Sequence, residues 1–129
     1  MSGLKVLIGG TRHAKATHGP AVWNVIAKEV PVPGDMTVIH GGARGVDAIA
    51  DAIARGYLML PPERIIVCPA DWETHGKAAG PIRNEQMLVE HQPDLVLAFP
   101  STLHPSRGTN DMVLRAKRHG VRTVVTWLS

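Results

Sequence analysis

The chain has 129 residues, of which 44% are hydrophobic and 19% charged, and its formal net charge is +3. This composition is typical of a globular domain, and no apolar run approaches the ~18 residues that a membrane span requires. The single cysteine excludes an internal disulfide, and the first residues lack the apolar core of a signal peptide. We therefore expect one cytoplasmic domain covering residues 1–129, with no membrane contact.

Short apolar runs alternate with helix-like segments along the whole chain. The expected strands are 4–8, 36–40, 64–68, 94–99 and 121–127. The expected helices begin near Gly19, at Val46, at Pro81 and after Thr109 as an N-cap, while Gly56 and Gly120 are expected to end the second and fourth. Near-continuously apolar strands alternating with helices predict an α/β fold, namely a Rossmann-like, doubly wound, mainly parallel five-stranded sheet with helices on both faces.

A glycine-rich turn separates the second expected strand from the helix that follows it. The turn reads Gly41-Gly42-Ala43-Arg44-Gly45. A strand, a glycine turn and a helix place backbone N–H groups where phosphate binds, and glycine allows the backbone to approach a ligand closely. The turn matches neither the GxGxxG nor the Walker pattern. It predicts one wall of a phosphate or nucleotide site, with its amides as donors.

Three other unusual loops also follow strands, at residues 9–13, 71–80 and 100–109. Ligands of open parallel sheets bind beyond the carboxyl ends of the strands, so we expect these loops to meet at one edge. A guanidinium group donates two parallel hydrogen bonds to phosphate. The candidate phosphate ligands are therefore Arg12, Arg44, Arg83 and Arg107.

Two further residues leave alternatives open. Asp47 lies in the first turn of the second helix, where it either complements the helix dipole or contacts a ribose hydroxyl. Trp72 lies in a polar loop and either stacks on a base or packs that loop onto the domain.

The seven histidines show no metal-ligand spacing, so neither a metal nor a cofactor is expected. The few aromatic residues argue against single-stranded nucleic acid as the main partner.

Taken in order, these motifs resemble the SLOG (SMF/DprA–LOG) superfamily, and within it the YspA/YpsA-related branch. The residues that carry the resemblance are Gly10-Thr11-Arg12, the run from Gly41 to Asp47, the segment from Ala70 to Met87, and Arg107-Gly108-Thr109 with the following Asn-Asp-Met. The superfamily contains LOG phosphoribohydrolases, the DNA-processing protein A and sensors of nucleotide-derived signals. The resemblance implies a Rossmann-like fold, a nucleotide-type ligand and a homo-oligomer (a dimer or higher).

Against the LOG hydrolases the match is partial. Arg83 and Met87 match their Arg-Lys-x-x-Met motif, with Asn84 in place of the lysine. Gly108 and Thr109 match their second glycine motif, but Met112 stands where the catalytic glutamate would be. A carboxylate that stabilises the charge developing on ribose is worth roughly 3–4 kcal/mol, so its absence weakens the case for hydrolysis.

The sequence therefore predicts a domain that binds a nucleotide or nucleotide-derived small molecule, with a sensing, sequestering or processing role. The alternative is a LOG-like nucleoside-monophosphate phosphoribohydrolase, in which Asp111 or Glu85 would supply the carboxylate, with Asp47 and Asp71 as further candidates. Single-stranded DNA binding is a third hypothesis, which the sequence supports less than the other two. The candidate ligand-binding residues are Gly10, Thr11, Arg12, Gly41, Gly42, Ala43, Arg44, Gly45, Asp47, Asp71, Trp72, Arg83, Asn84, Arg107, Gly108 and Thr109.

Overall fold

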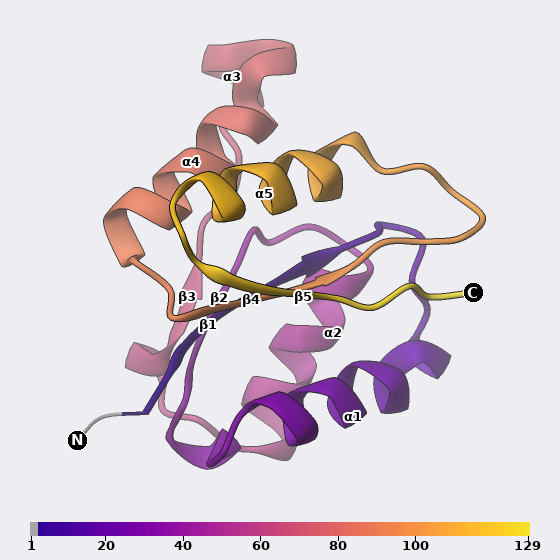
Figure 1. Cartoon of the computed structure of the whole chain (residues 1–129), viewed down its shortest axis with the longest axis vertical. Coiled ribbons are helices and arrows are strands. Elements are labelled where there is room, and N and C mark those ends of the chain that lie inside the picture. Colours follow the sequence, from indigo (N-terminus) through magenta and orange to yellow (C-terminus); the bar gives the residue numbers. More distant parts are fainter. Residues whose placement is uncertain (1–2) are drawn as a thin grey trace.

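The computed structural model describes residues 3–129 and contains one five-stranded sheet (Figure 1). Its strands are β1 (Lys5–Gly10), β2 (Thr37–His40), β3 (Ile65–Val67), β4 (Leu95–Phe99) and β5 (Arg122–Val125). The strand order is β3-β2-β1-β4-β5, and all four neighbouring pairs are parallel. The expected α/β class is confirmed, and the sheet is parallel throughout the described residues rather than only mainly so.

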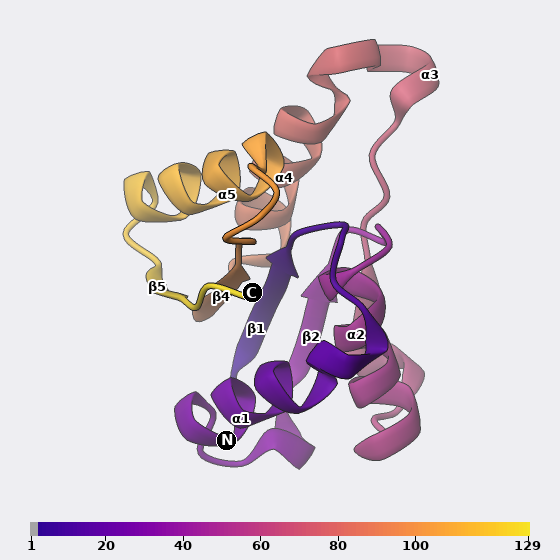
Figure 2. The same cartoon turned by 90° about the vertical axis from the view of Figure 1, so that its right-hand side faces the viewer.

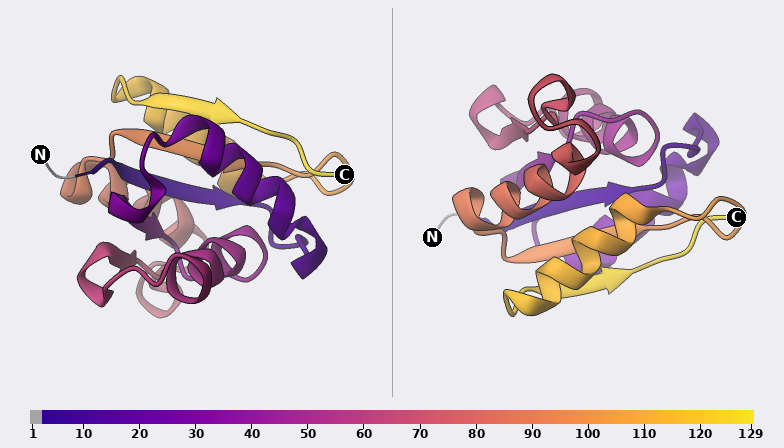
Figure 3. Two further views of the ribbon diagram at one scale, coloured as in Figure 1. Left: turned by 90° about the horizontal axis from the view of Figure 1, so that it is seen from below. Right: turned by 90° about the horizontal axis from the view of Figure 1, so that it is seen from above.

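Helices cover both faces of the sheet (Figure 3). Helices α1 (Gly19–Glu29) and α2 (Val46–Ala52) pack on one face, and α4 (Ala79–His91) and α5 (Arg107–Arg118) on the other. Successive residues of β1 point to opposite faces, so Val6 and Ile8 join the core under α1 and α2, whereas Leu7 joins the core under α4 and α5. The continuous apolar runs in the sequence are explained by this burial on both sides.

The switch in strand order falls between β1 and β4. The chain moves outward from β1 to β3 and then returns to place β4 on the other side of β1. The loops leaving β1 and β4 therefore turn toward opposite faces, which opens a crevice at the carboxyl edge of the sheet. Gly10 is paired with Phe99 at this edge, and the Thr11 amide donates to the Phe99 carbonyl at 3.0 Å.

Gly56 does not end the second helix, contrary to the expectation. Helix α2 continues into a π-helical turn, Ile53–Tyr57, and Gly56 lies inside this turn without a positive φ. The Leu58 amide closes the turn on the Ile53 carbonyl at 2.8 Å, and the left-handed residue is Met59, with a φ of 50°. The wider turn moves the reversal of the chain three residues beyond the glycine.

The starts of the last two helices also differ from the expectation. Ser106, not Thr109, caps α5, because its side-chain oxygen accepts the Thr109 amide at 3.2 Å while Arg107 and Gly108 are already helical. Helix α4 begins at Ala79, so Pro81 lies in its first turn rather than at its first residue. Proline is tolerated there because the first amides of a helix have no partner within the helix.

The loop between β3 and α4 contains a short helix, α3 (Trp72–His75), that projects away from the sheet (Figure 2). Every residue from 71 to 78 is exposed. Within residues 3–129, no helix is long and apolar enough to cross a bilayer.

Candidate ligand-binding cleft

A cleft of about 590 Å³ lies at the carboxyl edge of the sheet, at the switch point between β1 and β4. Its volume is that of a small-molecule site. Residues from all four unusual loops line it, so the structure brings these loops together. Of the candidates named from the sequence, the cleft is lined by Gly10, Thr11, Arg12, Gly41, Ala43, Asp47, Trp72, Arg83, Asn84, Arg107, Gly108, Thr109 and Asp111.

The glycine turn after β2 is built around close contact with the loop after β1. Gly45 has a φ of 78°, and a Cβ there would lie 2.2 Å from the Thr11 carbonyl oxygen. The Val46 amide donates to the same oxygen at 3.1 Å. The glycine at this position therefore serves contact between two loops of the protein.

Three amides of the glycine turn, those of Gly41, Gly42 and Ala43, are used within the protein, which corrects the expectation that these three hold a phosphate. Gly41 and Ala43 both donate to Oδ2 of Asp47, at 3.0 and 3.2 Å. Gly42 donates to Nδ1 of the buried His40 at 3.0 Å. A carboxylate and an imidazole already fill the positions that an anion would occupy, so the turn does not present these amides to a ligand.

Asp47 is the buried carboxylate of the cleft, with 6% of its surface exposed. Burial raises the pKa of this carboxyl above its ordinary value, although the Ala43 amide, His40 and Arg83 oppose the shift. Its bonds to Gly41 and Ala43 give it a role that neither sequence alternative named, which is to fix the glycine turn. A simple dipole effect would not require those two bonds.

Arg83 ties three segments together at the floor of the cleft. Its Nη1 donates to the carbonyl oxygens of Gly41 at 2.8 Å and Cys68 at 3.2 Å, and its Nε donates to Oδ1 of Asn84 at 3.0 Å. A Cβ at Gly41 would lie 2.2 Å from Nη1, so the glycine makes room for the guanidinium group. Burial lowers the pKa of Arg83. Nε and Nη1 of Arg83 therefore stabilise the fold of the protein itself.

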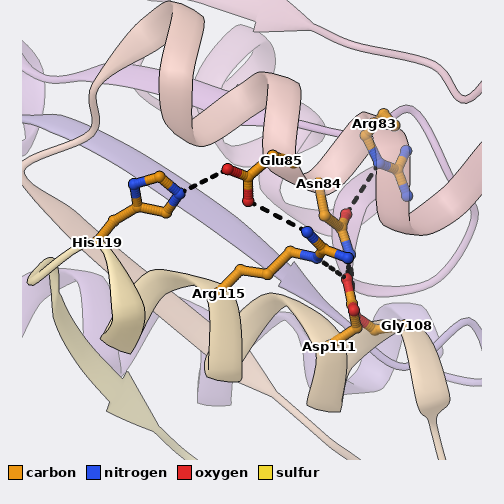
Figure 4. A network of polar contacts seen from close by, with 7 residues as sticks. All are labelled: Arg83, Asn84, Glu85, Gly108, Asp111, Arg115 and His119. Atoms are coloured by element: carbon orange, nitrogen blue, oxygen red, sulfur yellow. Dashed lines mark hydrogen bonds and ion pairs between the residues drawn. The ribbon is translucent and has the colours of Figure 1, made fainter.

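Asn84 continues this network from α4 to α5 (Figure 4). It is 3% exposed, and its Nδ2 donates to the Gly108 carbonyl at 3.2 Å and to Oδ2 of Asp111 at 3.0 Å. Asn84, which replaces a lysine of the LOG motif, therefore positions the amino end of α5. Sequence reasoning did not identify this role, because the partner helix lies 24 residues or more away along the chain.

The two carboxylates first suggested for catalysis are both paired with Arg115 (Figure 4). Asp111 Oδ2 accepts from Arg115 Nε at 2.8 Å, and Glu85 Oε1 accepts from Arg115 Nη1 at 3.2 Å. His119 lies 2.8 Å from the other oxygen of Glu85. Asp111 still lines the cleft, whereas Glu85 does not and instead borders a separate surface hollow together with Arg115.

Side chains from three loops meet at the mouth of the cleft. The Arg12 guanidinium lies over the Trp72 ring at 5.6 Å, and Trp72 remains 49% exposed. The rings of His13 and His104 stack at 3.9 Å. No local pattern in the sequence predicts this histidine pair, because only the fold brings the two loops together.

Five candidates named from the sequence do not line the cleft. They are Gly42, Arg44, Gly45, Asp71 and Glu85. Arg44 is exposed on the outside of the glycine turn. Asp71 caps α3 by accepting the Thr74 amide at 3.1 Å, and this hydrogen bond lowers the pKa of Asp71. His13 and Lys77 were not among the candidates but do line the cleft, as does Met87, which the sequence indicated only as part of the LOG motif.

The fold and the cleft together define a doubly wound parallel α/β domain with a ligand-sized cleft at its switch point. No protein-family model matches the chain. It is 41% identical over 125 residues to the Gene 61 protein of Mycobacterium phage D29, and the alignment covers 93% of this chain and 94% of that protein. The chain belongs to the same family as this phage protein.

Proposed function

We propose that this domain is a SLOG-type protein that binds a nucleotide or nucleotide-derived ligand in the cleft. The observation that carries the proposal is the amino end of α5. The amides of Arg107 and Gly108 donate to no protein acceptor within residues 3–129, and both residues line the cleft. The amino end of a helix attracts anions through free amides and the helix dipole.

The residues around these two amides favour a ligand that carries both a phosphate group and a nucleobase. Arg12, Lys77 and Arg107 line the same cleft and supply positive charge. The exposed Trp72 ring at the mouth offers a flat apolar face. Stacking of a base on such a ring is worth about 1–3 kcal/mol. The phosphate would lie at α5 and the base near Trp72.

A thermal-shift experiment with AMP, ADP-ribose, cyclic ADP-ribose and NAD tests the proposal. A ligand present at 100 times its Kd should stabilise the fold by about 2.7 kcal/mol. Arg12→Ala should reduce the shift. Arg118→Ala, which removes the same charge from the opposite end of α5, should leave the shift intact. No shift with any of the four nucleotides would refute the proposal.

Hydrolysis of an N-glycosidic bond is a second candidate function. It is favoured by the two carboxylates that line the cleft, Asp47 and Asp111. Asp111 is already bonded to Asn84 and Arg115, so Asp47 is the better placed of the two. Chromatographic detection of adenine released from AMP, and its loss in Asp47→Asn, would support this function. Binding of AMP without release would leave binding as the function.

A further inference from the structure

The two oxygens of Asp47 have different surroundings. Oδ2 accepts both amides of the glycine turn, from Gly41 and Ala43. No hydrogen bond reaches Oδ1 within residues 3–129, and no side-chain oxygen in this part of the chain is both fully buried and unpartnered. Because Asp47 lines the cleft, Oδ1 is open to it. The carboxylate therefore has one oxygen that holds the protein and one that is free to accept a hydrogen bond from a ligand.

Gly9 keeps the space beside this free oxygen open. It also lines the cleft, and a Cβ at Gly9 would lie 3.7 Å from Oδ1 of Asp47, with no other atom within 4 Å. Nothing in the local packing or in the sign of φ requires glycine at this position. The absence of a side chain instead leaves the approach to Oδ1 unobstructed.

The charges of the cleft determine which part of a nucleotide can approach Asp47. A carboxylate repels phosphate, whereas the amino end of α5 and the side chains of Arg12, Lys77 and Arg107 attract it. Arg83 also lines the cleft beside Asp47, but its Nη1 and Nε donate to oxygens of the protein, so Nη2 is the part left for a ligand. With the phosphate at α5 and the base near Trp72, the sugar is the part left for the floor of the cleft, and its hydroxyl groups are hydrogen-bond donors.

We propose that Oδ1 of Asp47 accepts a hydrogen bond from a ribose hydroxyl and so selects ribonucleotides over deoxyribonucleotides. This inference rests on the proposed function, because it requires a nucleotide in the cleft. It also assigns the orientation of the ligand, with the sugar against the glycine turn and the phosphate against α5. Asp47 is then a specificity-determining residue as well as the residue that fixes the turn.

Two variants separate these roles of Asp47. In Asp47→Asn, the amide oxygen can replace Oδ2 as acceptor for Gly41 and Ala43, while the amide nitrogen replaces Oδ1 and is a donor only. Gly9→Ala leaves Asp47 unchanged and fills the space beside Oδ1. Gly19→Ala is the matched control, because a Cβ there meets nothing within 4 Å and Gly19 does not line the cleft.

The experiment measures the affinity of each variant for AMP and ADP-ribose by calorimetry, alongside the 2′-deoxy and 3′-deoxy counterparts of the adenosine ribose. A hydroxyl bonded to a charged carboxylate should make the wild-type chain prefer the ribose form by about 10- to 100-fold. Asp47→Asn and Gly9→Ala should lose this preference, and Gly19→Ala should retain it. Circular dichroism identifies any variant that does not fold. If one of the two variants does not fold, the affinities of the other decide whether the preference for ribose depends on Oδ1.

The experiment distinguishes failure of the proposed function from failure of the role assigned to Asp47. Absence of binding by both ribonucleotides and the rest of the nucleotide panel refutes the proposed function, and this inference with it. Binding of AMP or ADP-ribose by the wild-type chain with no preference for the ribose form refutes only the role of Asp47. A preference that persists in a folded Asp47→Asn or Gly9→Ala variant refutes it as well.

Discussion

Replacing Gly45 by alanine tests the contact on which the cleft depends. Gly45 has a φ of 78° and a ψ of −128°, a region that other residues seldom adopt. A Cβ there would lie 2.2 Å from the Thr11 carbonyl oxygen and 2.7 Å from two backbone atoms of Arg12. These are main-chain atoms that cannot rotate away, so the loops after β1 and β2 would have to separate.

The cost of Gly45→Ala has two parts. A non-glycine residue in such a backbone conformation costs about 1–3 kcal/mol. Separation of the loops also breaks the hydrogen bond from Val46 to Thr11, which contributes about 1 kcal/mol. We therefore expect the free energy of unfolding to fall by about 3 kcal/mol, and the melting temperature by about 10 °C. Urea unfolding followed by circular dichroism measures the first, and a thermal scan the second.

The same substitution at Gly56 is the matched control. Gly56 lies in a helical turn with no positive φ, and a Cβ there meets nothing within 4 Å. Gly56→Ala should therefore raise the free energy of unfolding by about 0.5–1 kcal/mol. If Gly45→Ala unfolds at the same urea concentration as the wild-type chain, the contact between the loops is not the reason for this glycine. If Gly56→Ala instead has a lower free energy of unfolding than the wild-type chain, the expectation that Gly56 caps the helix would be supported.

Three further predictions follow from the cleft. Asn84→Ala should lower the free energy of unfolding by about 2–4 kcal/mol in urea, because it removes buried bonds to Gly108 and Asp111. A loss under about 1 kcal/mol would contradict its role between the helices. Burial raises the pKa of Asp47, so the stability from this group is present below the ordinary value of 3.8 and is lost as the pH rises through the folded value. Asp47→Asn should thus gain stability relative to the wild-type chain in urea titrations as the pH rises from about 4 through the raised pKa of the folded Asp47, and a constant difference would contradict this. Trp72→Ala should change stability by less than about 1 kcal/mol, since Trp72 is half-exposed, yet weaken AMP binding measured by calorimetry. Unchanged affinity would remove Trp72 from the base site.

The positions of the strands and of the loops around the cleft were predictable because their signals are local. Apolar runs such as 4–8 and 94–99 lie within a residue or two of β1 and β4. The parallel arrangement followed from the alternation of strands and helices, and it placed the four unusual loops at one edge. The resemblance to SLOG proteins remains an expectation that nucleotide binding would test.

Helix ends were harder to predict, because several residues compete for each cap. Ser106 and Thr109 are both good capping residues, and only the path of the chain after β4 decides that Ser106 caps α5. Gly56 carries the composition of a helix end, but the π-helical turn and the bond from Leu60 to Ala54 move the reversal to Met59. Neither outcome is encoded in the few residues around the cap.

The sequence by itself determined the class of fold, the edge of the sheet at which the four unusual loops form a cleft, and most of the residue types found there. The tertiary structure decided which of these residues are free to act. The glycine turn has the composition of a phosphate loop, yet three of its amides are bonded to Asp47 and His40. Two unbonded amides that line the cleft belong to Arg107 and Gly108 of α5, and the carboxylate oxygen open to the cleft belongs to Asp47. Hydrogen-bond donors and acceptors pair across distances in sequence that no local pattern records, so their availability is a property of the folded chain alone.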